Sequence, residues 1–250
     1  MLEAIFTKLS TIIQLGLCSL STLTCVNAAE PPSKLNITLP AGFEIAIFAK
    51  LDSAPRMMAF DKNGNLFVSS AKNNQIIMLP AANRDGASRA PILVSNQLNA
   101  PNGLAFLGDD LLVANQDGIV KLTQKLTQKN GQEIKQWTAP QPFISKLPSG
   151  GHTLKTIKVG PDNHLYLNVG SSCNVCVEDE PLRATILRYT LDGKPAGSQI
   201  QDTLNTSSPI LAKGLRNSQG FAWHPKSGDM FATNNGADNR SDKKKRQSKR

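Results

Sequence analysis

The residues whose types could do chemistry are concentrated in one stretch near the middle of the chain. His152 follows two glycines and precedes the apolar run of residues 157–159, so the sequence predicts an imidazole just ahead of a strand, where a cleft could receive it. Histidine suits general base catalysis because its pKa lies near the working pH of most enzymes. A lone histidine before a strand is also commonly a surface or capping residue, and the pattern by itself leaves both interpretations open.

Two cysteines with C-x-x-C spacing, Cys173 and Cys176, come shortly after this histidine, in a loop that ends in an acidic Val-Glu-Asp-Glu-Pro run. This spacing is found in small-loop disulfides, in redox enzymes and in one half of a zinc site. A redox-active pair normally opens a helix after a strand, and the sequence has neither a second C-x-x-C nor a histidine pair at ligand spacing. We therefore favour a structural disulfide.

These groups belong to a unit that occurs four times in the chain. Each copy is a short apolar run, a polar turn and a second apolar run, and the copies begin at Pro55, Pro101, Leu154 and Ser218, which are 46, 53 and 64 residues apart. Repeats of this length built from short strands are typical of propeller blades rather than of helical solenoids. The sequence therefore predicts an all-β propeller with about four blades.

Other segments are predicted from their own patterns. Residues 35–40 and 43–48 alternate apolar and polar side chains, as half-buried strands do. Residues 75–79 and 184–189 are predicted to close the first and third blades, and the polar, partly duplicated segment 123–136 is predicted to form a long hairpin. Residues that favour tight turns separate the paired strands at 61–64, 108–110, 161–163 and 225–228.

The net charge of +9 hints at nucleic acid, but its distribution argues against such a partner. Seven basic residues and one acidic residue lie in 240–250, so this segment carries +6 and the other 239 residues only about +3. The body is near neutral, and we expect no nucleic acid binding. Three interpretations of the basic tail compete: an arm for an acidic partner, a disordered tail, or a chain that departs from its reading frame near Asp242. We favour the last, because adenine-rich tracts encode lysine runs and are prone to frame slips.

The N-terminus is predicted to be an export signal that spans residues 1–29. Lys8 precedes a mostly apolar stretch, and small residues surround the expected cleavage positions, Ala28 and Ala29. The stretch is too short and too interrupted by serine and threonine to span a bilayer, so we expect no stable membrane insertion. An ordinary N-terminal helix is the alternative. An export signal predicts a periplasmic or secreted protein, a location that suits a disulfide.

Several motifs together resemble a known family. The segments that carry the resemblance are residues 150–152, 165–176, 183–187 and, above all, 214–225, with the sequence GLRNSQGFAWHP. They look like the soluble glucose/sorbosone dehydrogenases, six-bladed propellers that use pyrroloquinoline quinone (PQQ), and are most similar to the sorbosone dehydrogenase branch. The resemblance implies an incomplete propeller domain at residues 30–239, without the C-terminal blades of the family.

The resemblance implies a role for five residues. His152 matches the general base, which takes a proton from a sugar hydroxyl or aldehyde hydrate while hydride leaves carbon for the quinone. Arg216 matches the arginine that stabilises negative charge on the quinone oxygen, and Asn217 matches a hydrogen-bonding partner of the cofactor. The backbone carbonyls of Gly236 and Ala237 match the loop that holds a Ca²⁺ ion, a hard cation that prefers oxygen ligands. Ala237 stands where the family has proline, which leaves the carbonyl in place.

By this resemblance we expect a PQQ-dependent oxidoreductase of a sugar or sugar-derived aldehyde, with a small-molecule substrate and a downstream electron acceptor. Two alternatives stay open: a calcium-dependent lactonase built on a propeller, and a non-catalytic propeller that displays its loops to a partner. Too few acidic residues stand at strand starts to favour the lactonase. Because about four of six blades are expected, the activity of these 250 residues by themselves is left open.

Overall fold

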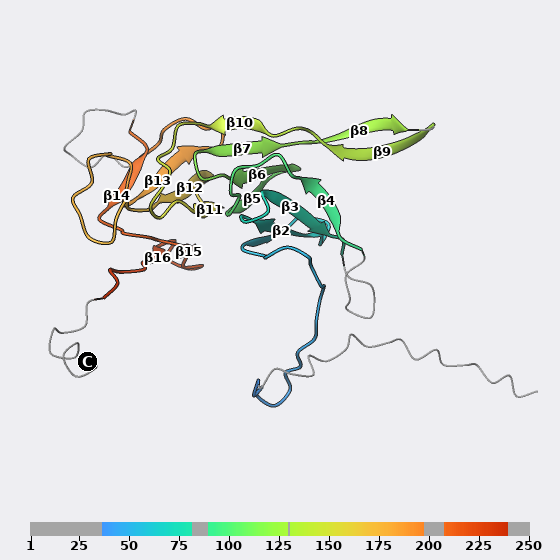
Figure 1. Ribbon diagram of the computed structural model, residues 1–250, viewed down its shortest axis with the longest axis horizontal. Helices are drawn as coiled ribbons and strands as arrows, with labels where there is room; N and C mark the ends of the chain where they lie inside the picture. The colour runs from blue at the N-terminus through green and yellow to red at the C-terminus, as the bar shows by residue number, and fades with distance from the viewer. Residues whose placement is uncertain (1–36, 82–89, 130, 198–207, 240–250) are drawn as a thin grey trace, which may run out of the picture.

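Antiparallel sheets that follow one another along the chain make up the structure. The computed structural model describes residues 37–81, 90–129, 131–197 and 208–239. Three four-stranded sheets come first, and a two-stranded sheet follows them (Figure 1). These ranges contain strands but no helix, and therefore no helix that could cross a membrane. The predicted all-β fold is confirmed, with three full sheets and two strands of a fourth.

In each of the three full sheets, neighbouring strands are antiparallel. The first sheet contains, in order, β1 (Met58–Phe60), β2 (Leu66–Ser70), β3 (Gln75–Leu79) and β4 (Ile92–Ser95). The second contains β5 (Leu104–Leu107), β6 (Asp110–Ala114), β7 (Ile119–Leu122) and β10 (Gln141–Ile144). The third contains β11 (Ile157–Val159), β12 (His164–Val169), β13 (Thr185–Thr190) and β14 (Ile210–Lys213). The two-stranded sheet pairs β15 (Gly220–Trp223) with β16 (Met230–Thr233).

The middle strand β6 is apolar on both faces because it lies between two neighbouring sheets. Leu111 and Val113 pack in a cluster with Phe67 of the first sheet. Leu112 and Ala114 pack in a second cluster, with apolar residues of the third sheet. All four side chains are completely buried, and burial of one leucine stabilises a fold by roughly 1.5–3 kcal/mol. The continuous apolar run in the sequence therefore reflects a sheet that is covered on both faces.

Successive sheets also meet along their first strands. The first strand of the second sheet, β5, lies beside β1 on one side and β11 on the other. Just before β5, the backbone N–H of Gly103 donates to the carbonyl of Lys155 (2.8 Å). A Cβ atom at Gly103 would lie 2.6 Å from the backbone nitrogen of Ile157, so this approach requires glycine. The first strands are thus neighbours of one another, as the inner strands of propeller blades are.

The predicted turns and the predicted hairpin are confirmed. The hairpin consists of β8 (Gln124–Lys129) and β9 (Gln132–Trp137), interrupts the second sheet between β7 and β10, and projects beyond the sheets in Figure 1. Gly64 and Asn163 adopt the positive φ angles, 79° and 57°, that tight turns between strands often need. The turns lie at residues 62–64, 108–109, 161–163 and 225–227.

Two predictions about strands are wrong. No strand forms at residues 37–48, although this segment alternates apolar and polar side chains. Phe43 is 69 % exposed, and the segment leads away from the sheets in Figure 1 except at its end, where Phe48 packs against the first sheet. The pattern failed because alternation yields a stable strand only where a sheet edge pairs with it. The strands β3 and β13 do not close their blades either, because β4 and β14 complete those sheets.

Several other predictions lie outside the described residues. They concern the export signal at 1–29, residues 35–36 of the first expected strand and the basic tail at 240–250. The boundaries of the propeller domain at 30–239 also remain predictions.

We predict that Gly103→Ala lowers the free energy of unfolding by about 1–3 kcal/mol, because the added methyl group must push the second sheet away from the third. Urea-induced unfolding followed by tryptophan fluorescence measures this difference. Gly236→Ala is a matched control, because a Cβ atom at Gly236 would meet nothing within 4 Å. Equal unfolding free energies for the two variants would contradict the close approach of the sheets.

Candidate active site

The ring of His152 is held by one residue, Ser171, which follows β12. The backbone N–H of His152 donates to the Ser171 carbonyl (3.0 Å), and the ring atom Nδ1 lies 3.0 Å from that carbonyl oxygen and 3.0 Å from Ser171 Oγ. The Ser171 hydroxyl donates its own proton to the Cys173 carbonyl (2.7 Å), so both oxygens near Nδ1 act as acceptors. The neutral imidazole therefore carries its proton on Nδ1, which leaves the lone pair on Nε2.

Two glycines allow the His152 segment and the Ser171 segment to lie this close together. A Cβ atom at Gly170 would lie 2.5 Å from His152 Cβ and 2.5 Å from the His152 carbonyl oxygen. A Cβ atom at Gly151 would lie 2.6 Å from the Ser171 carbonyl oxygen, and Gly151 has a φ of +59°. Glycines on both sides of the contact are therefore a steric requirement of the histidine position.

Arg216 lies on the other side of Ser171, in the segment that precedes β15. Its backbone carbonyl accepts from the Ser171 N–H (2.8 Å), so Ser171 connects the backbone of His152 with that of Arg216. The Arg216 side chain is 13 % exposed, and three of its five N–H groups are used. The partners are three oxygen atoms: the Asn174 carbonyl at Nε (3.1 Å), the Asn235 carbonyl at Nη1 (3.1 Å) and the Asp238 carboxylate at Nη2 (2.8 Å).

Asn217 is tied to the loop that carries the predicted metal ligands. Its backbone N–H donates to the side-chain oxygen of Asn234 (3.0 Å), and its carbonyl accepts from the Asn235 N–H (2.9 Å). Its own side-chain oxygen accepts from Gln219 Nε2 (2.6 Å). Together with the contacts of Arg216, these hydrogen bonds place residues 234–238 beside both members of the Arg-Asn pair.

The carbonyl oxygens of Gly236 and Ala237 suit a cation. Within the described ranges, neither oxygen accepts a hydrogen bond, and Gly236 is exposed with open space at its Cβ position. Asp238 adds a carboxylate next to them, and one of its oxygens is paired with Arg216. Backbone carbonyls and carboxylates are the ligands that Ca²⁺ prefers. This donor set therefore fits calcium as part of a larger coordination shell.

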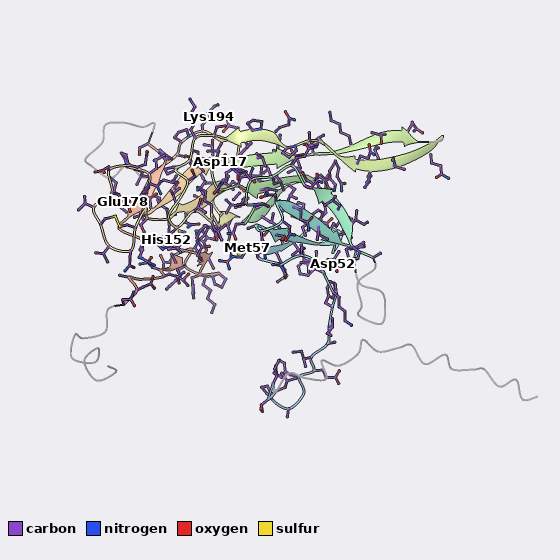
Figure 2. All side chains as sticks on the ribbon, in the orientation of Figure 1. Asp52, Met57, Asp117, His152, Glu178 and Lys194 are labelled. Atoms are coloured by element: carbon purple, nitrogen blue, oxygen red, sulfur yellow. A yellow bond between two sulfur atoms is a disulfide. The ribbon has the colours of Figure 1, made fainter. Side chains whose placement is uncertain are left out.

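All five residues predicted for the site lie in one neighbourhood. His152 comes from the segment ahead of β11, and the other four come from the segments on either side of the β15–β16 pair. Figure 2 shows His152 on the side of the molecule where the third and fourth sheets lie. The structure therefore brings an imidazole, a guanidinium and a carbonyl-rich loop together at the junction of two successive blades.

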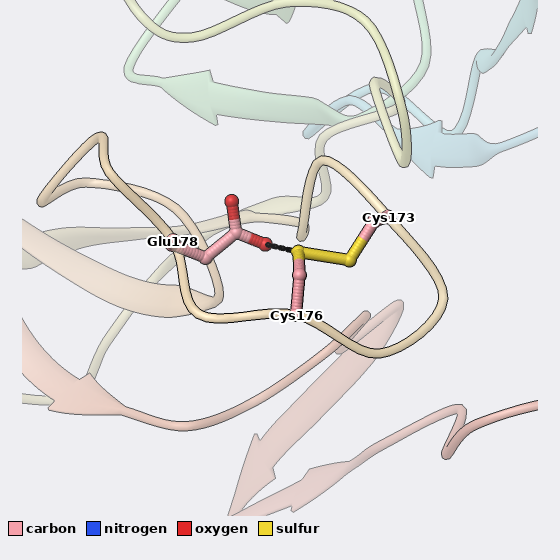
Figure 3. A group of neighbouring side chains, drawn as sticks. All are labelled: Cys173, Cys176 and Glu178. Atoms are coloured by element: carbon pink, nitrogen blue, oxygen red, sulfur yellow. Dashed lines mark hydrogen bonds between the residues drawn. A yellow bond between two sulfur atoms is a disulfide. The ribbon is translucent and has the colours of Figure 1, made fainter.

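The C-x-x-C loop is closed by a disulfide between Cys173 and Cys176, as predicted (Figure 3). A carboxylate oxygen of Glu178 lies 3.6 Å from Cys176 Sγ and accepts a hydrogen bond from the Ser172 N–H (2.8 Å). The two sulfur atoms and this carboxylate lie within 4.8 Å of one another, close enough to suggest a metal site. Metal binding requires thiolates, however, and both sulfur atoms are used in the disulfide. The loop has a structural role in this form of the protein.

A buried lysine fastens the His152 segment to the second sheet. Lys155 has no exposed surface, and its ammonium group donates to three backbone carbonyls, those of Gln116, Pro148 (2.8 Å) and Thr153 (3.1 Å). The pKa of Lys155 is lowered from its ordinary value of 10.5 to about 8, chiefly by burial and to a smaller extent by the charge of Arg183, while Asp117 acts in the opposite direction. Because Pro148 and Thr153 flank the histidine, the ammonium fixes this loop on both sides of His152.

The sequence did not reveal Ser171, Asn174 or Lys155 as parts of this site. Ser171 and Asn174 belong to residues 165–176, a segment noted for its cysteines and for the family resemblance, neither of which indicates these contacts. Lys155 resembles an ordinary charged residue at the start of an apolar strand. Ser171 and Asn174 contact residues that are distant in sequence, and Lys155 contacts Gln116 in addition to two carbonyls of its own segment. No local pattern encodes such contacts.

A hollow of about 670 Å³ lies elsewhere, against the first sheet. Its lining is apolar and includes Phe48, Met58 and Phe60, and no residue of the site described above borders it. Catalysis needs polar or titratable groups that converge on a reacting atom, and this hollow offers none. We therefore place the candidate active site at His152 and Arg216 rather than at this hollow.

Similar solved structures identify the fold. The holo PQQ domain of pyranose dehydrogenase from Coprinopsis cinerea is 20 % identical, with a TM-score of 0.66 over 85 % of this chain and 51 % of that one. The PQQ-bound aldose sugar dehydrogenase from Streptomyces coelicolor is 25 % identical, with a TM-score of 0.59 over 76 % and 59 %. A calcium structure of the AA12 enzyme from Trichoderma reesei is 18 % identical, with a TM-score of 0.63 over 80 % and 50 %. The fold is therefore the propeller of these dehydrogenases, as predicted.

The chain belongs to the TrAA12-like family, whose model matches residues 37–249. A curated protein from Borreliella burgdorferi, described as uncharacterized, is 27 % identical over 226 residues, which make up 88 % of this chain and 54 % of that protein. The chain thus spans about half the length of this relative and between 50 % and 59 % of the three solved structures.

We predict that Lys155 makes the free energy of unfolding depend on pH between about 8 and 10.5. Its folded-state pKa of about 8 lies below the ordinary value of 10.5, so the folded protein loses this proton first and stability rises as pH increases through the window. A shift of this size corresponds to about 3 kcal/mol. Denaturant unfolding of the wild type and of Lys155→Met at both ends of the window isolates the effect. Parallel pH curves for the two proteins would contradict it.

Proposed function

We propose that this chain carries the histidine, the arginine and part of the calcium loop of a PQQ-dependent oxidoreductase that oxidises a sugar or a sugar-derived aldehyde. The observation that carries the proposal is the arrangement around Ser171. This residue fixes the tautomer of His152, which leaves Nε2 as a base, and its N–H bonds to the Arg216 backbone. Oxidation of an alcohol or aldehyde hydrate needs such a base and a positive charge near the electron acceptor.

The relatives support this chemistry. Two of the solved structures named above are a PQQ domain of pyranose dehydrogenase and a PQQ-bound aldose sugar dehydrogenase. We further propose that the chain belongs to the sorbosone dehydrogenase branch, that an export signal sends it to the periplasm or the medium, and that an electron acceptor reoxidises it. The activity of the whole protein is part of the proposal, because the chain covers 51 % and 59 % of those two structures.

The imidazole of His152 has the tautomer and the orientation that it needs to take a proton from the substrate hydroxyl. The proton moves to Nε2, and the positive ring is stabilised because Nδ1–H already donates to the Ser171 carbonyl and hydroxyl oxygens. The ring needs no reorientation during the transfer, since these bonds fix its position. PQQ, when bound, accepts the hydride that leaves the substrate carbon.

Arg216 and the loop after β16 hold the acceptor in this proposal. Two N–H groups of the Arg216 guanidinium have no partner in the described part of the chain and can donate to a quinone oxygen. Asn217 offers its side-chain NH₂ group, because its side-chain oxygen is engaged by Gln219. The carbonyls of Gly236 and Ala237 would hold Ca²⁺, since neither accepts a hydrogen bond within the described residues.

The experiment that tests the proposal is cofactor loading. We expect PQQ to bind the purified apo-chain in the presence of Ca²⁺, with a change in quinone absorbance, and we expect a chelator of Ca²⁺ to reverse binding. A panel of aldoses and sugar aldehydes with an artificial electron acceptor then identifies the substrate. Absence of calcium-dependent PQQ binding in both this chain and a full-length relative would refute the function, and calcium-dependent lactone hydrolysis would select the lactonase alternative.

We predict that His152→Ala lowers kcat of the PQQ-loaded protein by about 10²- to 10⁴-fold, the usual contribution of a general base. Cofactor binding should change little, because the ring is held by Ser171 and not by the quinone pocket. His224→Gln is a matched control, since His224 is an exposed turn residue whose Nδ1 accepts from the N–H groups of Lys226 and Ser227. A His152→Ala variant with wild-type kcat would eliminate this mechanism.

A further inference from the structure

The disulfide loop brings one side chain, Asn174, between Arg216 and the loop after β16. The Asn174 carbonyl accepts from Arg216 Nε (3.1 Å). The Asn174 side chain makes a reciprocal pair with Asp238: its oxygen accepts from the Asp238 N–H (2.8 Å), and its NH₂ group donates to the Asp238 carbonyl (3.1 Å). The Asp238 carboxylate in turn accepts from Arg216 Nη2 (2.8 Å). Asn174, Arg216 and Asp238 therefore form a closed triangle of four hydrogen bonds.

Apart from its hydrogen bonds to Arg216 and Asp238, Asn174 is held by the disulfide that flanks it. Residues 174–177 are exposed and belong to no strand, and Val175 and Val177 are 77 % and 93 % exposed. The loop is fixed at its first cysteine, where the Cys173 carbonyl accepts from Ser171 Oγ, and near its end, where Glu178 accepts from the Ser172 N–H. A bridge across Cys173 and Cys176 restricts the conformations open to such a short segment and so orients the residue inside it.

We propose that Asn174, oriented by the Cys173–Cys176 disulfide, is a positioning residue that fixes Arg216 and residues 235–238 relative to each other. Asn174 bonds to both Arg216 and Asp238, so its displacement leaves the guanidinium joined to residues 235–238 by two contacts alone among the described residues, the Asn235 carbonyl and the Asp238 carboxylate. The consequence for catalysis rests on the proposed function, in which these two groups hold PQQ and Ca²⁺. The positioning itself concerns the chain alone.

Hydrogen–deuterium exchange of the full, cofactor-free chain tests the positioning directly. The Asp238 amide donates to the Asn174 side chain, so Asn174→Ala should increase its exchange rate by about fivefold or more, the usual effect of one lost hydrogen bond. The Cys173→Ser/Cys176→Ser double variant should increase it as well, although Asn174 is still present. Val175→Ala is the matched control, because this side chain lies in the same loop and is largely exposed. An Asp238 amide that exchanges at the wild-type rate in Asn174→Ala would overturn the proposal.

A second readout separates a positioning role from a purely structural one. With PQQ and Ca²⁺, Asn174→Ala should raise the half-saturating concentration of PQQ about tenfold while KM for the sugar stays within about twofold, because Arg216 and the 235–238 segment face the cofactor in the proposed function. An unchanged PQQ requirement in a variant with faster exchange would overturn the link to the cofactor site. If the wild type binds no PQQ but Asp238 exchanges faster in Asn174→Ala, the positioning role stands and the proposed function fails.

Discussion

Burial of both faces of the second sheet is the constraint on which the rest of this structure depends. In β6, Leu111 packs in the cluster shared with the first sheet and Leu112 in the cluster shared with the third. The second sheet therefore depends on both neighbouring sheets for its stability. This requirement sets the spacing of the sheets and forces their first strands together, with glycine where the backbones nearly touch. The ends of these strands are consequently fixed relative to one another by the packing of apolar side chains far from them.

The candidate site uses that rigidity. His152 and Arg216 come from segments ahead of the first strands of two successive sheets, and Ser171 joins them through its own backbone groups. Lys155 adds a completely buried cation whose contacts are backbone carbonyls, an arrangement that tolerates little movement. The precision that a proton transfer needs is therefore supplied by the scaffold, and the loops contribute the chemistry.

Local features of this chain could be predicted from the sequence, and contacts across blades could not. The repeat, its turns and the 123–136 hairpin were recognisable because each is encoded within a few residues. Grouping His152 with Arg216 depended on resemblance, since the residues themselves are far apart in the chain. The proton position on His152 depends on Ser171, and no pattern specifies that contact. The alternation of apolar and polar side chains at residues 43–48 led to a wrong prediction of a strand. A strand also needs a partner strand to pair with, and the local pattern carries no information about one.

The β8–β9 hairpin is closed at its base before it leaves the second sheet. The Thr138 N–H donates to the Thr123 carbonyl (2.9 Å), the Thr123 N–H donates to Thr138 Oγ1 (3.1 Å), and the rings of Trp137 and Phe67 form a T-shaped pair. Because of these contacts at its base, strain or motion in the β8–β9 hairpin is not transmitted to the second sheet. The repeated Lys-Leu-Thr-Gln sequence in and before β8 looks like a small tandem duplication. A hairpin closed at its base in this way is free to lengthen, shorten or diverge during evolution, because such changes leave the packing of the propeller sheets unaltered.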